Sequence, residues 1–470
     1  MPRDRQIYIL DPKDLTPETI AVTFAKTSRS PLSFRAIADD LTAEKSSEFH
    51  EKWVVGYGHA SVAEHAVLHL AFENISRLAV ETLQGCRLAS FTEKSTRYQK
   101  WGAQDFYTPE EIAQSPYTEV YSSACTILFE TYLRSLDAVE NWLQSNAPER
   151  ENEESAARQR RLRTDAIDAS RFLLPSAALA NVGMTVNARE LEHAITKMLS
   201  SPVSEVRLIG EEMKAVARRE VPTLVKYASP SKYLQELPAS IPFPHENNLP
   251  PHNWCVLQTF DPQAVDHLCA AVLFRYGQDT YEAAFSHAQL MDPAEKQELL
   301  QRLLGEINAY ELPVREAEHL NFAFEIIMDQ GAFYEFKRHR MMSLSTQALT
   351  PNLGYCIPAL IEKAGMLEEY CSAMEAARQA WQEIAPVLPD AAAYFVPNGY
   401  NRRVFTSINL RSLLHLVRLR TRPTAHFSIR RVAYRMVECV RNELPAIGAF
   451  LPVPDHETWQ GIEKDNFMQC

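Results

Sequence analysis

The stretch Asn187-Ala-Arg-Glu-Leu-Glu-His193 returns later in the chain as Asn409-Leu-Arg-Ser-Leu-Leu-His415, with Asn, Arg, Leu and His in matching places. The helical run that follows each copy ends in a similar pattern, Arg219-Glu-Val-Pro222 and Arg441-Asn-Glu-Leu-Pro445. A third anchor lies upstream, where Glu-His precedes an apolar run at Glu64-His65 and at Glu318-His319. Three anchors in one order and at nearly constant spacing indicate a tandem duplication.

A proline-rich stretch without glycine, from Ser229 to Asn253, separates the two copies. Proline removes a backbone donor and restricts the backbone, so this stretch is predicted to continue neither a helix nor a central strand. The boundary is therefore placed there. Residues 1–229 are expected to form the first repeat, 230–252 the linker and 253–470 the second repeat.

Both copies contain strand-like and helix-like patterns. Ala66–Phe72 and Leu320–Ile327 have frequently alternating apolar residues, which is typical of half-buried strands. Ser204–Arg219 and Phe427–Asn442 are amphipathic and are predicted to be long helices. The expected fold class is α+β, with two tandem copies of a unit whose helices pack on an antiparallel or mixed sheet.

The composition limits the class of protein and its partners. The 470 residues, 46% hydrophobic and 23% charged, suit a soluble chain of two ordinary domains. A net charge of −12 argues against binding to polymeric nucleic acid or to an anionic membrane. No signal peptide or spanning segment is recognisable, so a cytoplasmic location is expected. The eight cysteines have no spacing for a metal site or a disulfide framework, and no glycine-rich phosphate loop is present.

Three motifs carry residue types suited to binding phosphates and a cofactor. Gly58-His-Ala-Ser-Val-Ala-Glu-His65 precedes the first expected strand, and Ser90-Phe-Thr-Glu-Lys-Ser-Thr-Arg-Tyr98 follows the next helix. The second half contributes Arg338-His-Arg-Met-Met-Ser343. An arginine fork matches phosphate oxygens with two charge-assisted hydrogen bonds, and serine hydroxyls complete the oxygen shell.

These motifs resemble the flavin-dependent thymidylate synthases, whose signatures are GHxSxxEH and RHRxxSxNxxSxRY. The resemblance covers most of both halves, including Arg171-Phe-Leu-Leu-Pro175 and the two Asn-x-Arg helices. It implies FAD as cofactor, NADPH and methylenetetrahydrofolate as cosubstrates, and transfer of a one-carbon unit to C5 of dUMP. The site of this family is assembled from several subunits of a homotetramer. Two duplicated chains are therefore expected to form a homodimer that imitates that tetramer.

Each half keeps a different part of the family pattern. The first half reads Gly85-Cys-Arg87 where the family has Arg-His-Arg, whereas the tail of the motif is retained there. In the second half the tail has lost its Ser and Arg, which are replaced by Ala348 and Thr350. Further along, Arg171 is matched with Ala385 and Arg420 with Met198. Losses and retentions are nearly complementary, which predicts one composite site per chain.

The resemblance assigns the site residues. Ser95, Arg97 and Arg171 would hold the dUMP phosphate, while Glu93 and Arg420 would approach the sugar and base. The residues implied for FAD are His59, Ser61, Arg338, His339, Arg340, Asn409, Arg411 and His415. No metal ligand is predicted, and Cys86, which stands in the histidine place of the motif, is interpreted as a small buried residue.

Alternatives remain open at this level. Residues 394–403 are interpreted as an insertion before the second Asn-x-Arg helix, which leaves room for another pyrimidine nucleotide as substrate. The Asn of the family motif is missing in both halves, where Thr92 and Ser345 stand, so a flavin- or nucleotide-binding protein without turnover is the other alternative. Taken singly, the motifs also fit a capped helix start, a basic helix end and ordinary amphipathic helices.

Overall fold

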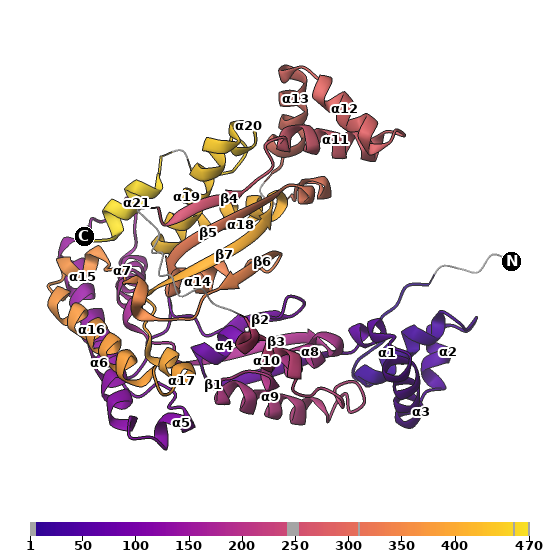
Figure 1. The fold of residues 1–470 in the computed structure, drawn as a ribbon, viewed down its shortest axis with the longest axis horizontal. Helices are drawn as coiled ribbons and strands as arrows, with labels where there is room; N and C mark the ends of the chain where they lie inside the picture. Colours follow the sequence, from indigo (N-terminus) through magenta and orange to yellow (C-terminus); the bar gives the residue numbers. More distant parts are fainter. Residues whose placement is uncertain (1–5, 242–252, 309–310, 455, 469–470) are drawn as a thin grey trace.

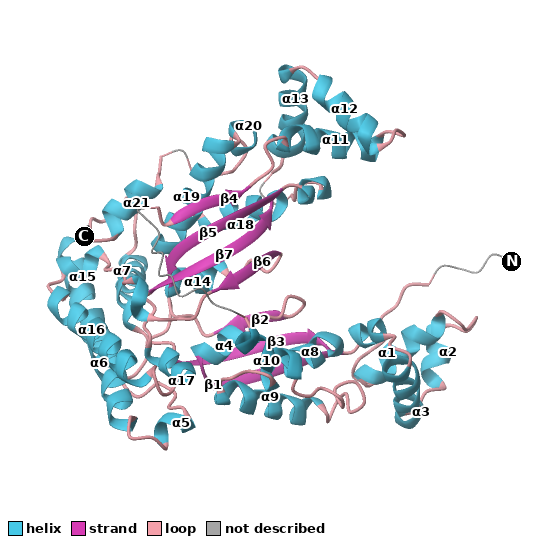
Figure 2. Cartoon of the chain, viewed as in Figure 1, coloured by secondary structure: helices cyan, strands magenta, loops and turns pink. Residues whose placement is uncertain are grey.

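The computed structural model describes residues 6–241, 253–308, 311–454 and 456–468. Each half of the chain contributes one antiparallel sheet, and helices pack against both sheets (Figures 1 and 2). This confirms the α+β class and the two tandem copies. No described helix is both long and apolar enough to cross a membrane.

The first sheet has the strand order β1-β3-β2. It consists of β1 (Val67–Ser76), β2 (Ser90–Glu93) and β3 (Leu179–Asn187). The side chains of β3 alternate, because Ala180, Val182, Met184 and Val186 point into the core and are nearly fully buried. The helices packed on this sheet are α4 (Arg77–Leu83), α8 (Ala188–Leu199) and α9 (Ser204–Ala217). The strand and helix predicted here are thus both confirmed.

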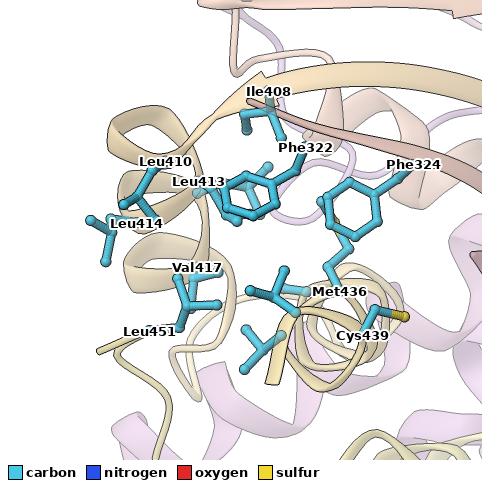
Figure 3. Packing of buried hydrophobic residues seen from close by; sticks show 14 of the residues in the cluster. Phe322, Phe324, Ile408, Leu410, Leu413, Leu414, Val417, Met436, Cys439 and Leu451 are labelled. Atoms are coloured by element: carbon cyan, nitrogen blue, oxygen red, sulfur yellow. The ribbon is translucent and has the colours of Figure 1, made fainter. Parts of the chain in front are cut away.

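The second sheet has the order β4-β5-β7-β6 and repeats the same plan with one more strand. Its strands are β4 (Cys255–Thr259), β5 (Asn321–Asp329), β6 (Met342–Thr346) and β7 (Asn401–Asn409). The helices on it are α14 (Gln330–Phe336), α18 (Leu410–Arg420) and α19 (Phe427–Glu443). Figure 3 shows Phe322 and Phe324 of β5 directed towards Leu413 of α18 and Met436 of α19. All of these side chains are fully buried.

The two halves share a third hydrophobic core. α6 (Thr118–Asn146) and α7 (Ser155–Ser170) of the first half pack with α15 (Ala359–Lys363) and α16 (Leu367–Ile384) of the second. Phe129 and Phe172 from the first half lie in one buried cluster with Tyr370 and Tyr400 from the second. The sheets are therefore held in a fixed relation by packing.

The remaining helices lie at the ends and edges of these layers. α1 to α3 form an N-terminal group that Figure 1 places at the end of the first sheet distant from α14. α11 to α13 form the corresponding group of the second half. The bounds are α1 (Pro17–Thr27), α2 (Phe34–Asp39), α3 (Ala43–Phe49), α5 (Glu110–Ala113), α11 (Ala264–Tyr276), α12 (Tyr281–Leu290), α13 (Pro293–Leu300), α17 (Pro389–Ala392), α20 (Pro445–Gly448) and α21 (Trp459–Asn466).

The two copies are related by an approximate twofold axis, and a pair of equivalent hydrogen bonds joins them across it. Ser176 N donates to Val396 O, and Asn398 N donates to Leu174 O. The two bonds are equivalent under the duplication, and Pro175 faces Pro397 in an antiparallel bridge between them. Such reciprocity, in which i contacts j and j contacts i, is the mark of an isologous contact.

This pairing corrects two sequence interpretations. The counterpart of Arg171 is Ala393, because these residues begin the equivalent one-turn helices Arg171–Leu173 and Ala393–Phe395, so the match with Ala385 is wrong. Residues 394–403 are not an insertion, since they form that turn and the start of β7, as the corresponding first-half residues do before β3. Ala385 precedes Leu388-Pro389 at the spacing with which Arg171 precedes Leu174-Pro175, and this local similarity produced the wrong match.

The linker begins with a helix, α10 (Lys232–Ser240), which contains Pro238. The prediction that no helix continues into this stretch is therefore wrong for its first part. Ser231 caps this helix by accepting a hydrogen bond from Leu234 N, and all of its side chains are outside the core. Residues 242–252 of the predicted linker lie outside the described residues.

Candidate functional site

The ends of α14 and α18 meet first-half residues at a buried cluster of charges. Glu335, at the end of α14, has Arg171 of the first half at 3.2 Å (Nη2 to Oε1) and Arg420 of α18 at 3.1 Å (Nη1 to Oε2). The side chains of Arg171 and Glu335 are only 5% and 9% exposed. Burial tends to raise the pKa of Glu335, but Arg171, His426, Arg420 and Arg97 together hold it below its ordinary value. The carboxylate is therefore ionised between the arginines.

Arg97 of the first half lies near this cluster and pairs with Asp168. Its Nε and Nη2 donate to the two carboxylate oxygens of Asp168 at 2.9 and 2.6 Å. Its Nη1 donates to the carbonyl oxygen of Thr424 in the second half at 2.9 Å. Ser95 lies in the same turn, where its hydroxyl accepts from Arg97 N. The structure therefore places Ser95, Arg97, Arg171 and Arg420 near one another.

Glu93, at the end of β2, is bound from both halves. Its carboxylate accepts hydrogen bonds from Arg77 (2.7 Å) and Gln84 (3.0 Å), and Arg338 Nη2 lies 3.8 Å away. Burial opposes ionisation, yet Arg77 and Lys337 lower the pKa of Glu93 below its ordinary value. Glu93 is thus a fixed negative group with Arg338 of the second half beside it.

His339 is a neutral hydrogen-bond acceptor. Arg420 Nε donates to His339 Nε2 at 2.9 Å, so the proton of the neutral ring is on Nδ1. Burial, followed by the nearby Arg420 and His415, lowers the pKa of His339 to about 3. The ring of His415 lies 5.8 Å from that of His339 between centroids. The predicted residues His339, Arg420 and His415 are therefore adjacent.

A pocket of about 310 Å³ opens between the halves beside this cluster. From the first half it is lined by Glu93, Phe91 and Thr92, and from the second by Arg338 and Arg340. Gln84 and Lys337 complete the lining. The pocket offers an aromatic side chain, a fixed carboxylate and two guanidinium groups, a set that suits a ring carrying polar groups together with an anionic group.

The other residues predicted for FAD lie elsewhere in the chain. Asn409 caps α18 by accepting from Ser412 N, and Arg411 pairs with Glu318 at 2.6 Å. His59 and Ser61 line a separate pocket of about 720 Å³ among the N-terminal helices, together with Trp53. Within one chain, the predicted cofactor residues therefore form separate groups rather than one pocket.

Sequence reasoning missed Glu335, Asp168 and Lys337. Glu335 lies three residues before Arg338 in the sequence, close to the Arg-His-Arg motif. That spacing was the available signal for Glu335. Asp168 has no such signal, because only the tertiary contact of α7 with the β2 loop brings it to Arg97. Cys86 is buried as predicted, and burial raises the pKa of its thiol to about 11.

The position related to this cluster by the twofold axis lacks its charges. Thr82, Cys86, Met198, Ala393 and Thr350 stand where Glu335, His339, Arg420, Arg171 and Arg97 stand on the first side. On that side of the axis, the guanidinium of Arg402 bonds to Glu81 (2.6 Å), Thr346 Oγ1 (3.0 Å) and Gln347 O (2.8 Å). The duplicated fold therefore carries its arginine cluster on one side only.

The fold and the cluster define a duplicated α+β protein with a charged site between its two copies. The sequence model of the thymidylate synthase complementing protein family matches residues 13–223 and 256–446. The chain belongs to this family, the flavin-dependent thymidylate synthases, and contains the family unit twice.

Some relatives match nearly the whole chain and others match about half of it. The chain is 30% identical to a UPF0159 protein of Chlamydia muridarum, over 96% of this chain and 93% of the relative. It is 28% identical to a flavin-dependent thymidylate synthase of Clostridium tetani, over 46% of this chain and 83% of that protein. A crystal structure of flavin-dependent thymidylate synthase from Helicobacter pylori, complexed with FAD and dUMP, is 21% identical with a TM-score of 0.30, covering 41% of this chain and 95% of that one.

Proposed function

We propose that the chain is a flavin-dependent thymidylate synthase, which transfers a one-carbon unit from methylenetetrahydrofolate to C5 of dUMP using FAD and NADPH. The observation that carries the proposal is the convergence of Arg97, Arg171 and Arg420 from both halves beside the 310 Å³ pocket. Family membership supports the choice of reaction.

The arginines are the proposed phosphate site. Arg97 and Arg171 are held by Asp168 and Glu335, which keep the guanidinium groups fixed before a ligand arrives. A phosphate dianion accepts charge-assisted bonds from the arginines and competes with these carboxylates for them. Ser95 adds a hydroxyl donor from the same turn. Arg420 is positioned by its hydrogen bond to the neutral His339 and is proposed to contact the base of dUMP. Glu93 is proposed to accept a hydrogen bond from the sugar.

Arg338, His339, Arg340 and His415 are the proposed cofactor residues of this site. Their chemistry suits FAD, because Arg338 and Arg340 bring two guanidinium groups to the 310 Å³ pocket and the rings of His339 and His415 lie close together. When bound, FAD supplies the hydride that reduces the transferred carbon. The proposed role of these residues is to hold positive charge and hydrogen-bond donors in fixed positions around the flavin ring and to exclude water from it.

His59 and Ser61 line a pocket that has no lining residue in common with this one. We propose that they serve the site of a second chain. The same holds for Asn409 and Arg411, whose positions at the start of α18 leave them outside the cluster. A homodimer with the arrangement of the family tetramer brings these groups to one cofactor.

The alternative of another pyrimidine nucleotide loses its sequence argument. The room for it came from interpreting residues 394–403 as an insertion, and these residues form the turn before β7 and the start of that strand. The alternative without turnover, based on Thr92 and Ser345, is decided by the assay below.

The test is formation of dTMP by flavin-loaded protein supplied with dUMP, methylenetetrahydrofolate and NADPH. The parent is expected to form dTMP. Arg97→Ala is expected to weaken dUMP binding by about 1.5–3 kcal/mol, or roughly ten- to hundredfold. Thr350→Ala, the equivalent position of the other half, is the matched control and keeps the parent affinity. No dTMP from loaded parent protein contradicts the proposed activity and favours a binding protein, whereas loss in Thr350→Ala alone reverses the assignment of the halves.

A further inference from the structure

A second pocket, of about 360 Å³, adjoins the first across the twofold axis. Gln84, Lys337 and Arg340 line both pockets. In the second pocket Thr346 holds the place that Glu93 holds in the first, and Arg87 holds the place of Arg340. The second pocket is therefore the duplicate of the first, on the side that lacks the arginine cluster.

This duplicate carries two charged side chains that its counterpart lacks. Lys197 lines it where the other half has Leu419, and Glu81 lines it where the other half has Tyr334. The pattern indicates a site with a different specificity.

The charge of the pocket is positive. Arg87, Lys197, Lys337 and Arg340 line it, and Glu81 is the one acidic side chain among its described lining residues. Glu81 is already paired with Arg402 at 2.6 Å. His339 is neutral, because burial and the nearby arginine keep its pKa far below neutral pH. An anionic ligand is the chemistry that this set of side chains favours.

Two local features leave cations available to a ligand. The ammonium of Lys337 is buried and has no hydrogen-bond partner among the described residues. At Gly85 a β-carbon would lie 2.8 Å from Lys197 Nζ, so the glycine gives the lysine room at the pocket. The buried Phe333 and Met342, together with Leu344, form an apolar wall beside these cations.

We propose that this second pocket binds a small phosphate-bearing molecule, with its phosphate at Arg87, Lys197 and Arg340 and its apolar part against Phe333. The site goes beyond the proposed function, because it uses the side of the duplication that the nucleotide does not. Lys337 and Arg340 lie between the two pockets and face both.

The test is calorimetric titration of the flavin-loaded full chain with inorganic pyrophosphate after the first pocket has been saturated with dUMP. The parent is expected to bind one pyrophosphate per chain. Lys197→Leu, which introduces the residue type of the other half, is expected to weaken this binding about tenfold or more. Lys197 is exposed, so the variant is expected to fold. Lys232→Leu on α10 removes the same charge from a residue that does not line the pocket and is expected to bind as the parent does.

The proposal is overturned if dUMP-saturated parent binds no pyrophosphate, or if Lys197→Leu binds it with parent affinity. Failure of the proposed function has a separate signature. If dUMP itself does not bind, pyrophosphate is titrated into Arg171→Ala and Lys197→Leu without dUMP. Binding that survives in Arg171→Ala and is lost in Lys197→Leu supports the second pocket even then. Binding lost only in Arg171→Ala contradicts it.

Discussion

Arg171 of the first half and Glu335 of the second form a buried ion pair, with Nη2 and Oε1 3.2 Å apart. The residues related to them by the twofold axis are Ala393 and Thr82, which carry no charge. The contact that joins the halves at the site therefore exists once in the chain. This asymmetry within a duplicated fold is the observation behind the proposal of a single composite site.

The substitution Glu335→Gln tests whether the carboxylate of Glu335 balances the charges of Arg171 and Arg420. The substitution leaves Arg171 and Arg420 buried without their shared carboxylate, and we expect a loss of roughly 3 kcal/mol in the free energy of unfolding. Chemical denaturation at neutral pH measures it. Because the carboxylate competes with a phosphate, saturating dUMP is expected to stabilise the variant more than the parent. Thr82→Ala is the matched control, and equal stability of both variants would mean that Glu335 does not balance the arginines.

The flavin prediction separates the two copies of the motif. Purified protein is expected to be yellow with at most about one FAD per chain, since the first half lacks the Arg-His-Arg cations. His339→Ala and Arg340→Ala are expected to lower the flavin-to-protein absorbance ratio, and Cys86→Ala, at the place equivalent to His339, to leave it unchanged. Two tightly bound flavins per chain would contradict this assignment. Flavin occupancy equal to that of the parent in both His339→Ala and Arg340→Ala would place the flavin elsewhere.

The lowered pKa of Lys337 predicts that the free energy of unfolding depends on pH. Burial lowers the pKa of its ammonium to about 8 from 10.5, although Glu81 and Glu93 oppose the shift. The unfolded chain then binds the extra proton between these two values, so this residue makes stability rise with pH across that window. Relative to Lys337→Met, the parent is expected to gain on the order of 1–2 kcal/mol between pH 8 and 9.5. Denaturation curves that keep a constant difference over this range would contradict a buried, titrating amine.

The roles assigned to the nucleotide-binding residues stay predictions, whereas the sequence correctly predicted the duplication and the main strands and helices. These succeeded because strand alternation and the repeated Asn-x-Arg helices are local patterns with direct structural meaning. The match of Arg171 with Ala385 failed, since a local Leu-Pro similarity outweighed the spacing to β7. The ion pairs Arg97–Asp168 and Arg402–Glu81 could not be predicted from the sequence, because each joins segments that are distant in the chain.

Assembly is expected to complete the site. The pocket of His59 and Ser61 and the 310 Å³ pocket share no lining residue, so a homodimer in which one chain serves the other is predicted. Light scattering with in-line chromatography is expected to give twice the chain mass of 53.4 kDa. A monodisperse monomer that forms dTMP would show that each chain completes its own site.

The most direct measurement of the composite site is the number of dUMP molecules bound per chain, determined by calorimetry on the parent and on Arg97→Ala and Thr350→Ala. One strong site per chain is expected, because the equivalent of Arg97, Arg171 and Arg420 in the other half is Thr350, Ala393 and Met198. That site is expected to weaken in Arg97→Ala and to persist in Thr350→Ala. Two dUMP sites of equal affinity, or one site that ignores Arg97 and depends on Thr350, would contradict the division of the site between the two halves.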